Sequence, residues 1–413
     1  MNTATNITTA GTDKISARCW VAFGICVLSN MLGGTVSTIM SVYLPTVVHD
    51  LLGDVTPQRI NDVSAYINAL YIVGWTIGGF TWGFISDQIG RAKALVLAIG
   101  FFGVFTILIA FLNTWEAVVA FRMLDGFGVG GVLVISATYL SEIFPERLRS
   151  IVVGILSIGF PIGIFSAGLV NYIVADWRQG FWVGILPVVL AILSVGLLQE
   201  SEKWKNRTVI STHEKITLGG NLDKIMWGSL IFGSMLIGLW AIFSWVPTWI
   251  QSLLANADAQ KERGLSMMLL GAGGLTGGFI SGWVANALGI RKSMIICFTA
   301  CLILSFLLFK VNTSFSSIIY GEIALLALFF GMSQGLLSVY IPGLFPTRIR
   351  ATATGICFNL GRLFTAAAVF FVGALVTTLG GYGNAIFIFS LVFLIGLVAI
   401  FFTKTEINPH SES

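Results

Sequence analysis

The sequence predicts an all-α membrane protein with twelve transmembrane helices in two pseudo-symmetric six-helix bundles. Hydrophobic residues make up 56% of the 413-residue chain and charged residues 10%, against about 25% charged residues in a soluble domain. Apolar runs of about 20 residues recur along the chain, and each is long enough to cross a hydrocarbon core of about 30 Å. Two loop motifs occur twice, about half a chain length apart. Such an internal repeat is typical of transporter folds.

The helices are placed at the apolar runs. Residues 1–17 are polar, and the first apolar run is too long for a signal-peptide core, so it should be the first membrane helix. The longest polar segment, residues 199–224, is interpreted as a cytoplasmic linker between a first half, residues 1–198, and a second half, residues 225–413. The expected helices are 19–45, 63–85, 93–113, 116–140, 151–175, 179–198, 225–250, 265–287, 293–312, 317–341, 351–378 and 382–403.

The two halves share loop motifs and glycine spacing. The first motif pairs Gly83, Asp87 and Gly90 with Gly282, Asn286 and Gly289, 199 residues later. The second pairs Phe144, Pro145, Arg147 and Arg149 with Phe345, Pro346, Arg348 and Arg350, 201 residues later. Small-x-x-x-small pairs, such as Gly74 with Gly78 and Gly273 with Gly277, predict helices that approach one another closely.

The distribution of charge predicts how the chain sits in the membrane. If the N-terminus is cytoplasmic, sixteen Lys and Arg residues face the cytoplasm and five face outside. This bias places both termini on the cytoplasmic side of the plasma (inner) membrane. The membrane helices are expected to contact the lipid bilayer. The net charge of +4 is spread over short loops, so no nucleic-acid partner is expected. The five cysteines lack metal-site spacing, and we expect no metal, no cofactor and a monomer.

Four charged side chains fall inside the expected helices and away from their ends, where a charge costs at least about 2.5 to 3.5 kcal/mol and indicates function. These residues are Arg122, Asp125, Glu322 and Arg362. Arg122 and Asp125 are three residues apart and can pair, either for proton coupling or as a purely structural ion pair. Because all three histidines lie outside the helices, a proton relay must use Asp125 or, as the shallower alternative, Glu322.

Arg362 has no charged neighbour on its own helix. It is either paired across the interface between the halves or holds an anionic substrate, because its planar fork suits a carboxylate. Polar and aromatic side chains on other helices could complete a substrate pocket, although packing against protein or lipid is the alternative role for each aromatic. These residues are Asn30, Tyr71, Trp240, Trp245, Gln334 and Tyr340.

The repeated motifs resemble those of the major facilitator superfamily. Its loop signature between helices 2 and 3 is matched by Gly83, Asp87, Gly90 and Arg91, although Gln88 and Ala92 depart from it. A carboxylate and bases at a tight turn can lock a cytoplasmic gate by interacting with helix ends. We therefore expect a gating role for the signature residues and for two arginines of the second motif. The expected gating residues are Gly83, Asp87, Gly90, Arg91, Arg147 and Arg348.

Within this superfamily, the chain resembles the metabolite:proton symporter and sugar porter branch, and sialic acid transporters in particular. The resemblance rests on Arg122-x-x-x-Gly126-x-Gly128-x-Gly130 and on the segment 344–362. It implies a major facilitator fold. The acidic element that such symporters carry in helix 1 is absent here, because residues 29–35 read Ser-Asn-Met-Leu-Gly-Gly-Thr. A coupling role for helix 1 is therefore not carried over.

The sequence thus predicts a secondary active transporter that works by alternating access and is not an enzyme. The expected activity is proton-coupled uptake of a small organic anion, such as a sugar acid, sialic acid or a related carboxylate. The alternatives are a sugar facilitator or symporter, or efflux of drug-like compounds. A membrane enzyme has less support, because no metal cluster, Ser-His pair or phosphate-binding loop stands among the helices.

Overall fold

The computed structural model describes residues 16–206, 221–254, 259–345 and 349–403, and within them twelve helical spans are long and apolar enough to cross a membrane. The expected all-helical fold is confirmed. The first six spans are α1 (Ala17–Leu52), α2 (Pro57–Ile89), α3 (Arg91–Ile109), α4 (Trp115–Ile143), α5 (Glu146–Ile173) and the joined α6 (Trp177–Gly180), η1 (Phe181–Gly184) and α7 (Ile185–Leu197). A short helix, α8 (Glu202–Lys205), follows them.

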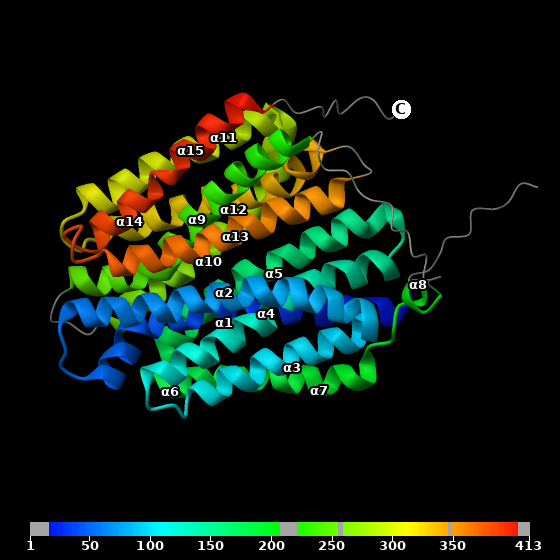
Figure 1. Cartoon of the computed structure of the whole chain (residues 1–413), viewed down its shortest axis with the longest axis horizontal. Coiled ribbons are helices and arrows are strands. Elements are labelled where there is room, and N and C mark those ends of the chain that lie inside the picture. The colour runs from blue at the N-terminus through cyan, green and yellow to red at the C-terminus, as the bar shows by residue number, and fades with distance from the viewer. Residues whose placement is uncertain (1–15, 207–220, 255–258, 346–348, 404–413) are drawn as a thin grey trace, which may run out of the picture.

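The second set of spans begins after the gap at 207–220. It consists of α9 (Leu222–Leu253), α10 (Gln260–Leu288), α11 (Ile290–Phe306) with η3 (Leu307–Val311), α12 (Ile318–Tyr340) with η4 (Pro342–Leu344), α13 (Arg350–Ala374), and α14 (Tyr382–Ser390) with α15 (Val392–Phe402). Helices α1–α7 and α9–α15 form two groups in Figure 1, and α2 and α5 of the first group pack against α13 and α10 of the second. The division of the chain at 199–224 stays a prediction, and most of that segment lies outside the described residues.

The first two helices are longer than the expected ranges. Helix α1 continues to Leu52 and ends at Gly53, whose φ of 63° favours glycine. Helix α2 begins at Pro57, where the Thr56 hydroxyl accepts a hydrogen bond from the Arg59 amide. A proline at the first helical position suits such an N-terminus. The ends of these helices are therefore set by capping residues rather than by the ends of the apolar runs.

Glycines bring helix pairs into backbone contact at equivalent places in the two groups. A Cβ atom at Gly74 on α2 would lie 1.9 Å from the Met123 carbonyl oxygen on α4. A Cβ atom at Gly277 on α10 would lie 1.8 Å from the Leu328 carbonyl oxygen on α12. The expected close packing is confirmed. Gly277 lies 199 residues after Gly78, where a Cβ atom would lie 2.0 Å from the Phe127 carbonyl oxygen, so both groups use glycines in this way, in a membrane setting where packing drives helix association.

The two groups of helices are hydrogen-bonded at the end of the molecule that carries the α13–α14 connection, here called the α14 end (Figure 1). The Asn61 amide on α2 accepts from the Tyr382 hydroxyl at 2.6 Å and donates to the Thr377 hydroxyl at 3.2 Å. Close by, Gln58 donates to the Ala374 carbonyl at 3.2 Å. A second contact joins α10 to α5 and α1, through Gln260 with Asn171, and Arg263 with Thr46. These bonds hold the groups together at the α14 end.

Candidate functional site

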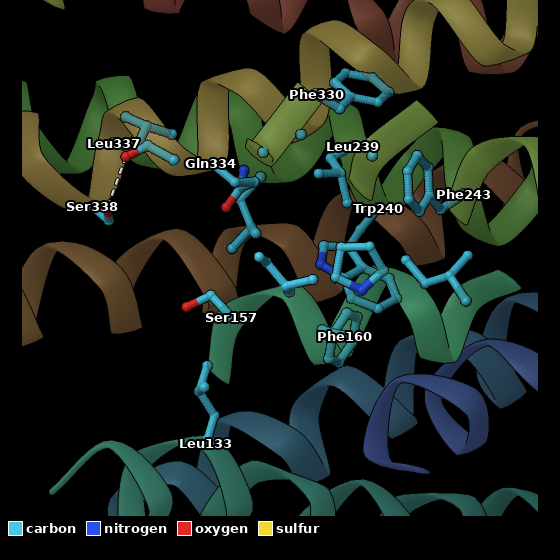
Figure 2. A pocket seen from close by; sticks show the side chains of 18 of the residues that line it. Leu133, Ser157, Phe160, Leu239, Trp240, Phe243, Phe330, Gln334, Leu337 and Ser338 are labelled. Atoms are coloured by element: carbon cyan, nitrogen blue, oxygen red, sulfur yellow. Dashed lines mark hydrogen bonds between the residues drawn. The ribbon is translucent and has the colours of Figure 1, made fainter. Parts of the chain in front are cut away.

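A cavity of about 500 Å³ lies between the two groups of helices (Figure 2). Its walls come from α1, α2, α4 and α5 on one side and from α9, α10, α12 and α13 on the other. Seven of its 28 lining residues are Trp or Phe, and seven carry other polar or charged side chains. Concave, mostly apolar sites with a few placed polar groups are typical of small-molecule binding.

The cavity is closed toward the α14 end and open toward the opposite end, where α8 and the α2–α3 turn lie, here called the α8 end. Ser157 and Ser338, near the α8 ends of α5 and α12, line the cavity and are exposed. Trp240, Phe243 and Phe330 line its other part and are buried, and Figure 2 shows the two sets toward opposite sides. The groups of helices are therefore apart at the α8 end and joined at the α14 end.

Aromatic side chains of both groups meet in the cavity wall. The ring centroid of Trp75 on α2 lies 5.1 Å from that of Trp240 on α9, in an edge-to-face arrangement. Trp75 also stacks on Phe160 of α5, with centroids 5.7 Å apart and an interplanar angle of 16°. Such ring pairs hold one another by quadrupole interactions as well as by burial of apolar area. Trp75 is a cavity residue that the sequence analysis did not single out.

Arg362 supplies the cationic group of the cavity wall. One guanidinium nitrogen donates to the Asn359 side-chain oxygen at 3.3 Å, and the guanidinium carbon lies 5.9 Å from the Trp75 ring centroid. Among the described residues, no carboxylate lies within 4.0 Å of this guanidinium. Arg362 therefore combines an unneutralised charge with a partly buried position in an apolar cavity.

Two of the expected pocket amides also line the cavity. The Asn30 side chain on α1 is 3% exposed and donates to the Leu156 carbonyl at 2.7 Å. The Gln334 amide on α12 faces the cavity (Figure 2), and its nitrogen is buried without a hydrogen-bond partner. With Trp240 and Arg362, four of the seven expected substrate residues are thus brought to one cavity.

Arg122 and Asp125 form an ion pair of 2.6 Å on α4, as their spacing allows, and are 1% and 0% exposed. Arg122 also donates to two α1 carbonyls, and Asp125 accepts from the Thr106 hydroxyl of α3 at 3.2 Å. The pair is enclosed by α1–α4 and does not line the cavity. Removing one partner of such a pair leaves an uncompensated buried charge, which is strongly destabilising.

Tyr71 and Trp75 lie between this ion pair and the cavity. The guanidinium carbon of Arg122 lies 3.9 Å from the Tyr71 ring centroid, and the Tyr71 hydroxyl is 2.5 Å from the Ser37 hydroxyl. On the next turn of α2, the Trp75 ring centroid is 6.2 Å from that of Tyr71. A continuous line of rings and guanidinium groups therefore runs from Arg122 through Tyr71 and Trp75 to Arg362.

Three expected site residues lie away from the cavity. Trp245 is fully buried and donates to the Val369 carbonyl at 3.1 Å, and the Tyr340 hydroxyl is 2.5 Å from that of Thr403. Glu322 lies in the first turns of α12, near the α14 end, and accepts from the Asn312 amide at 2.6 Å. The structure does not bring these three side chains to Arg362 or Asp125, and their functional roles stay predictions.

The expected gating loop forms a polar network within the first group of helices. Arg91 binds Asp87 at 2.5 Å and Glu142 of α4 at 3.0 Å. The Glu200 carboxylate accepts from the Arg91 amide at 2.6 Å, at the N-terminus of α3. The Glu200 carboxylate also lies against Gly90, whose φ of 106° favours glycine. A Cβ atom at Gly90 would lie 2.1 Å from a Glu200 carboxylate oxygen. Acidic groups are favourable at a helix N-terminus because of its partial positive charge.

Two other expected gating residues, Gly83 and Arg147, take no part in this network. Gly83 lies on α2 with room around it, since a Cβ atom would approach only Val134, at 3.9 Å. Arg147 is exposed at the start of α5, and Arg348 lies outside the described residues. Glu142 is a partner that the sequence analysis missed. Glu142 is an acidic residue in the last turn of α4, next to the repeated Phe144 motif. Its place beside a repeated loop motif could have marked it as a member of the gate.

The comparisons with known proteins agree with this architecture. The Major Facilitator Superfamily model matches residues 23–369. The chain is 27% identical over 340 residues to a probable 4-methylmuconolactone transporter of Cupriavidus pinatubonensis, covering 79% of this chain and 78% of the relative. It is 24% identical over 416 residues to the cis,cis-muconate transport protein of Acinetobacter baylyi (96% and 98%) and 27% identical over 350 residues to the sialic acid transporter NanX of Escherichia coli (81% and 83%).

Solved structures show the same fold at lower identity. A D-xylose-proton symporter matches with a TM-score of 0.79 and 17% identity, covering 94% of this chain and 97% of that one. An inward-open structure of the E. coli xylose transporter XylE matches with a TM-score of 0.76 and 18% identity, covering 93% and 95%. With twelve membrane-crossing spans and a family match over most of its length, the chain belongs to the Major Facilitator Superfamily and is a multi-pass membrane transporter, not an enzyme.

Proposed function

We propose that this transporter carries a small organic anion into the cell, coupled to protons. The observation that carries the proposal is Arg362, a cation without a carboxylate partner among the described residues, in the wall of an apolar cavity. Leaving a charge unpaired in a poorly solvated site costs free energy. A substrate carboxylate removes that cost and fits the guanidinium fork through two parallel hydrogen bonds.

The lining of the cavity favours an acid with an apolar ring or chain. Seven aromatic side chains offer flat apolar contacts, whereas a sugar acid would need a hydrogen-bond partner for each hydroxyl group. Two of the relatives are named for muconate and 4-methylmuconolactone, which are compact and unsaturated. Sialic acid and sugar acids are the second candidate, supported by the sialic acid transporter among the relatives. A neutral sugar would leave Arg362 unpaired.

For proton coupling we propose Asp125 as the carrier. It is fully buried and paired with Arg122. The only carboxylate of α1, Asp50, lies in the last turn of that helix and pairs with Arg178 at the α14 end. Protonation of Asp125 would release the Arg122 guanidinium, which contacts both α1 and the Tyr71 ring. The pair is thereby coupled to the helix that carries Trp75 into the cavity. Glu322 is the second candidate carrier, and its place near the α14 end is the argument against it.

Alternating access would proceed by rocking of the two groups about the cavity. If both termini lie on the cytoplasmic side of the inner membrane, the α8 end faces the cytoplasm. The open cavity would then correspond to an inward-open state. The network of Asp87, Arg91 and Glu142 would then act in the outward-open state, when the α8 ends of the groups approach each other. One chain supplies both walls of the cavity, so a monomer suffices.

Purified protein in proteoliposomes tests this function. An imposed pH gradient should drive accumulation of an unsaturated or aromatic acid, such as trans,trans-muconate or benzoate, and glucuronate tests the sugar-acid candidate. Folded Asp125→Asn protein, in which the amide can still bond to Arg122, should lose accumulation but keep counterflow exchange, because exchange needs no net proton movement. Glu322→Gln should keep both. Accumulation by Asp125→Asn would reject that residue as the carrier, and the absence of uptake of any acid would reject the anion proposal.

A further inference from the structure

The buried amide of Gln334 points to a second polar requirement of the substrate. Its nitrogen has almost no exposed surface and no hydrogen-bond partner, although the residue lines the cavity. A buried donor without an acceptor lowers the stability of the state that contains it. Asn30 and Arg362, which line the same cavity, already donate to Leu156 and Asn359. Gln334 therefore offers hydrogen-bonding capacity that the protein itself leaves unused.

Helix α12 holds this side chain against the cavity by tight packing on α10. A Cβ atom at Gly331 would lie 1.9 Å from the Gly274 carbonyl oxygen, and one at Gly335 would lie 2.2 Å from the Ser281 hydroxyl oxygen. Helix α12 therefore lies in close contact with the α10 backbone at Gly331 and with the Ser281 side chain at Gly335, which leaves little room for it to rotate about its axis. Phe330 and Ser338, one turn to either side of Gln334, line the cavity as well. This face of α12 is thus fixed toward the substrate space.

The carboxamide group of Gln334 can rotate about the terminal side-chain bond, although the helix that carries it is tightly packed. Figure 2 shows its oxygen turned toward the cavity and its nitrogen turned away. Rotation about the terminal side-chain bond of glutamine has two broad, similar minima, and a half-turn exchanges the two atoms. A substrate with a hydrogen-bond acceptor near α12 would bring the NH₂ group into the cavity and satisfy it.

We propose that Gln334 is a second anchor, and that the transported acid carries a hydrogen-bond acceptor in addition to the carboxylate held by Arg362. Suitable acceptors are a ring nitrogen, a carbonyl or a second carboxylate. The inference rests on the proposed function, because it assumes that the carboxylate occupies Arg362. An acid without the second acceptor fills the same space but leaves the Gln334 donor unsatisfied and is bound more weakly.

Matched pairs of acids test this requirement on the purified full-length protein by titration calorimetry. Nicotinate differs from benzoate by one ring nitrogen, and 4-acetylbenzoate differs from 4-isopropylbenzoate by a carbonyl in place of an alkyl branch. The wild type should bind the second-acceptor member of at least one pair about 5- to 100-fold more tightly, the range expected from satisfying a buried donor. Gln334→Met keeps the length of the side chain and should reduce this ratio to about one, chiefly by weakening the acceptor-bearing acid.

Asn68 on α2 provides the matched control. Its amide nitrogen is also buried without a partner and the residue is 4% exposed, but it does not line the cavity. Asn68→Leu should therefore keep the wild-type binding ratio. If Gln334→Met does not fold, Gln334→Leu replaces it in the same titration.

The outcomes separate the inference from the function on which it rests. A wild type that binds the acids without preference in either pair overturns the inference and leaves the proposed function intact. A ratio that persists in Gln334→Met or Gln334→Leu overturns it as well. If the folded wild type binds none of the four acids, the proposed function fails for this class of anion, and the inference fails with it.

Discussion

The hydrogen bonds of Asn61 should set how often the α14 end of the transporter opens. Asn61 bonds to Tyr382 at 2.6 Å and to Thr377 at 3.2 Å, across the two groups of helices. Each such bond contributes about 0.5 to 1.5 kcal/mol net, since water replaces it when the end opens. Asn61→Ala removes both bonds, so we expect the free energy of opening to fall by about 1 to 3 kcal/mol. The ratio of open to closed molecules should then rise roughly 5- to 150-fold.

Distances between spin labels at Val55 and Thr378 would report this shift, because both residues are exposed near the α14 end on different groups of helices. Asn384→Ala is the matched control, since that amide bonds to Lys310 and Gly380 within the second group only. We expect a longer-distance population to grow in Asn61→Ala and to stay at the wild-type level in Asn384→Ala. Equal distance distributions in wild type and Asn61→Ala would refute the role of these bonds in holding the end closed.

Two further predictions concern stability. Gly277→Ala should prevent stable folding, because the new methyl group would lie 1.8 Å from a carbonyl oxygen, whereas Gly321→Ala, with nothing within 4 Å, should melt like the wild type. Equal melting temperatures for the two variants in detergent would contradict the packing. Arg122→Met should cost about 3 to 5 kcal/mol by leaving Asp125 charged and buried, and a second change, Asp125→Leu, should recover most of that loss. A melting temperature for Arg122→Met close to that of the wild type would show that the pair is not needed for the fold.

Much of the fold could be predicted from the sequence, because membrane helices have a strong apolar signal. All twelve expected helices are present, and the glycine spacing at Gly74 and Gly277 marked the close packing of α2 on α4 and of α10 on α12. Helix ends could not be predicted as well. The polar residues before 63 continue α2 back to Pro57, because the Thr56 cap and the proline favour the helix there.

The candidate site was only partly predictable, since ionisable residues within apolar runs are conspicuous but their surroundings are not. The spacing of Arg122 and Asp125 allowed for their pairing, and the isolation of Arg362 along its helix left open whether another helix supplied a partner. Trp75 could not be distinguished from the other tryptophans, because its importance comes from Trp240 on another helix. Trp245, from the same stretch as Trp240, packs elsewhere, since neighbours on a helix face different directions.

The central claim is that Arg362 binds the carboxylate of the substrate, and the binding of an acid to purified Arg362→Lys protein tests it most directly. Arg178→Lys serves as the control, because Arg178 pairs with Asp50 at the α14 end, away from the cavity. A single ammonium group cannot reproduce the two parallel bonds of the guanidinium fork. We expect Arg362→Lys to weaken the binding of the acid at least about tenfold, a loss of about 1.4 kcal/mol, while the binding of the matching neutral amide is unchanged. Unaltered affinity for the acid in folded Arg362→Lys protein would contradict the claim.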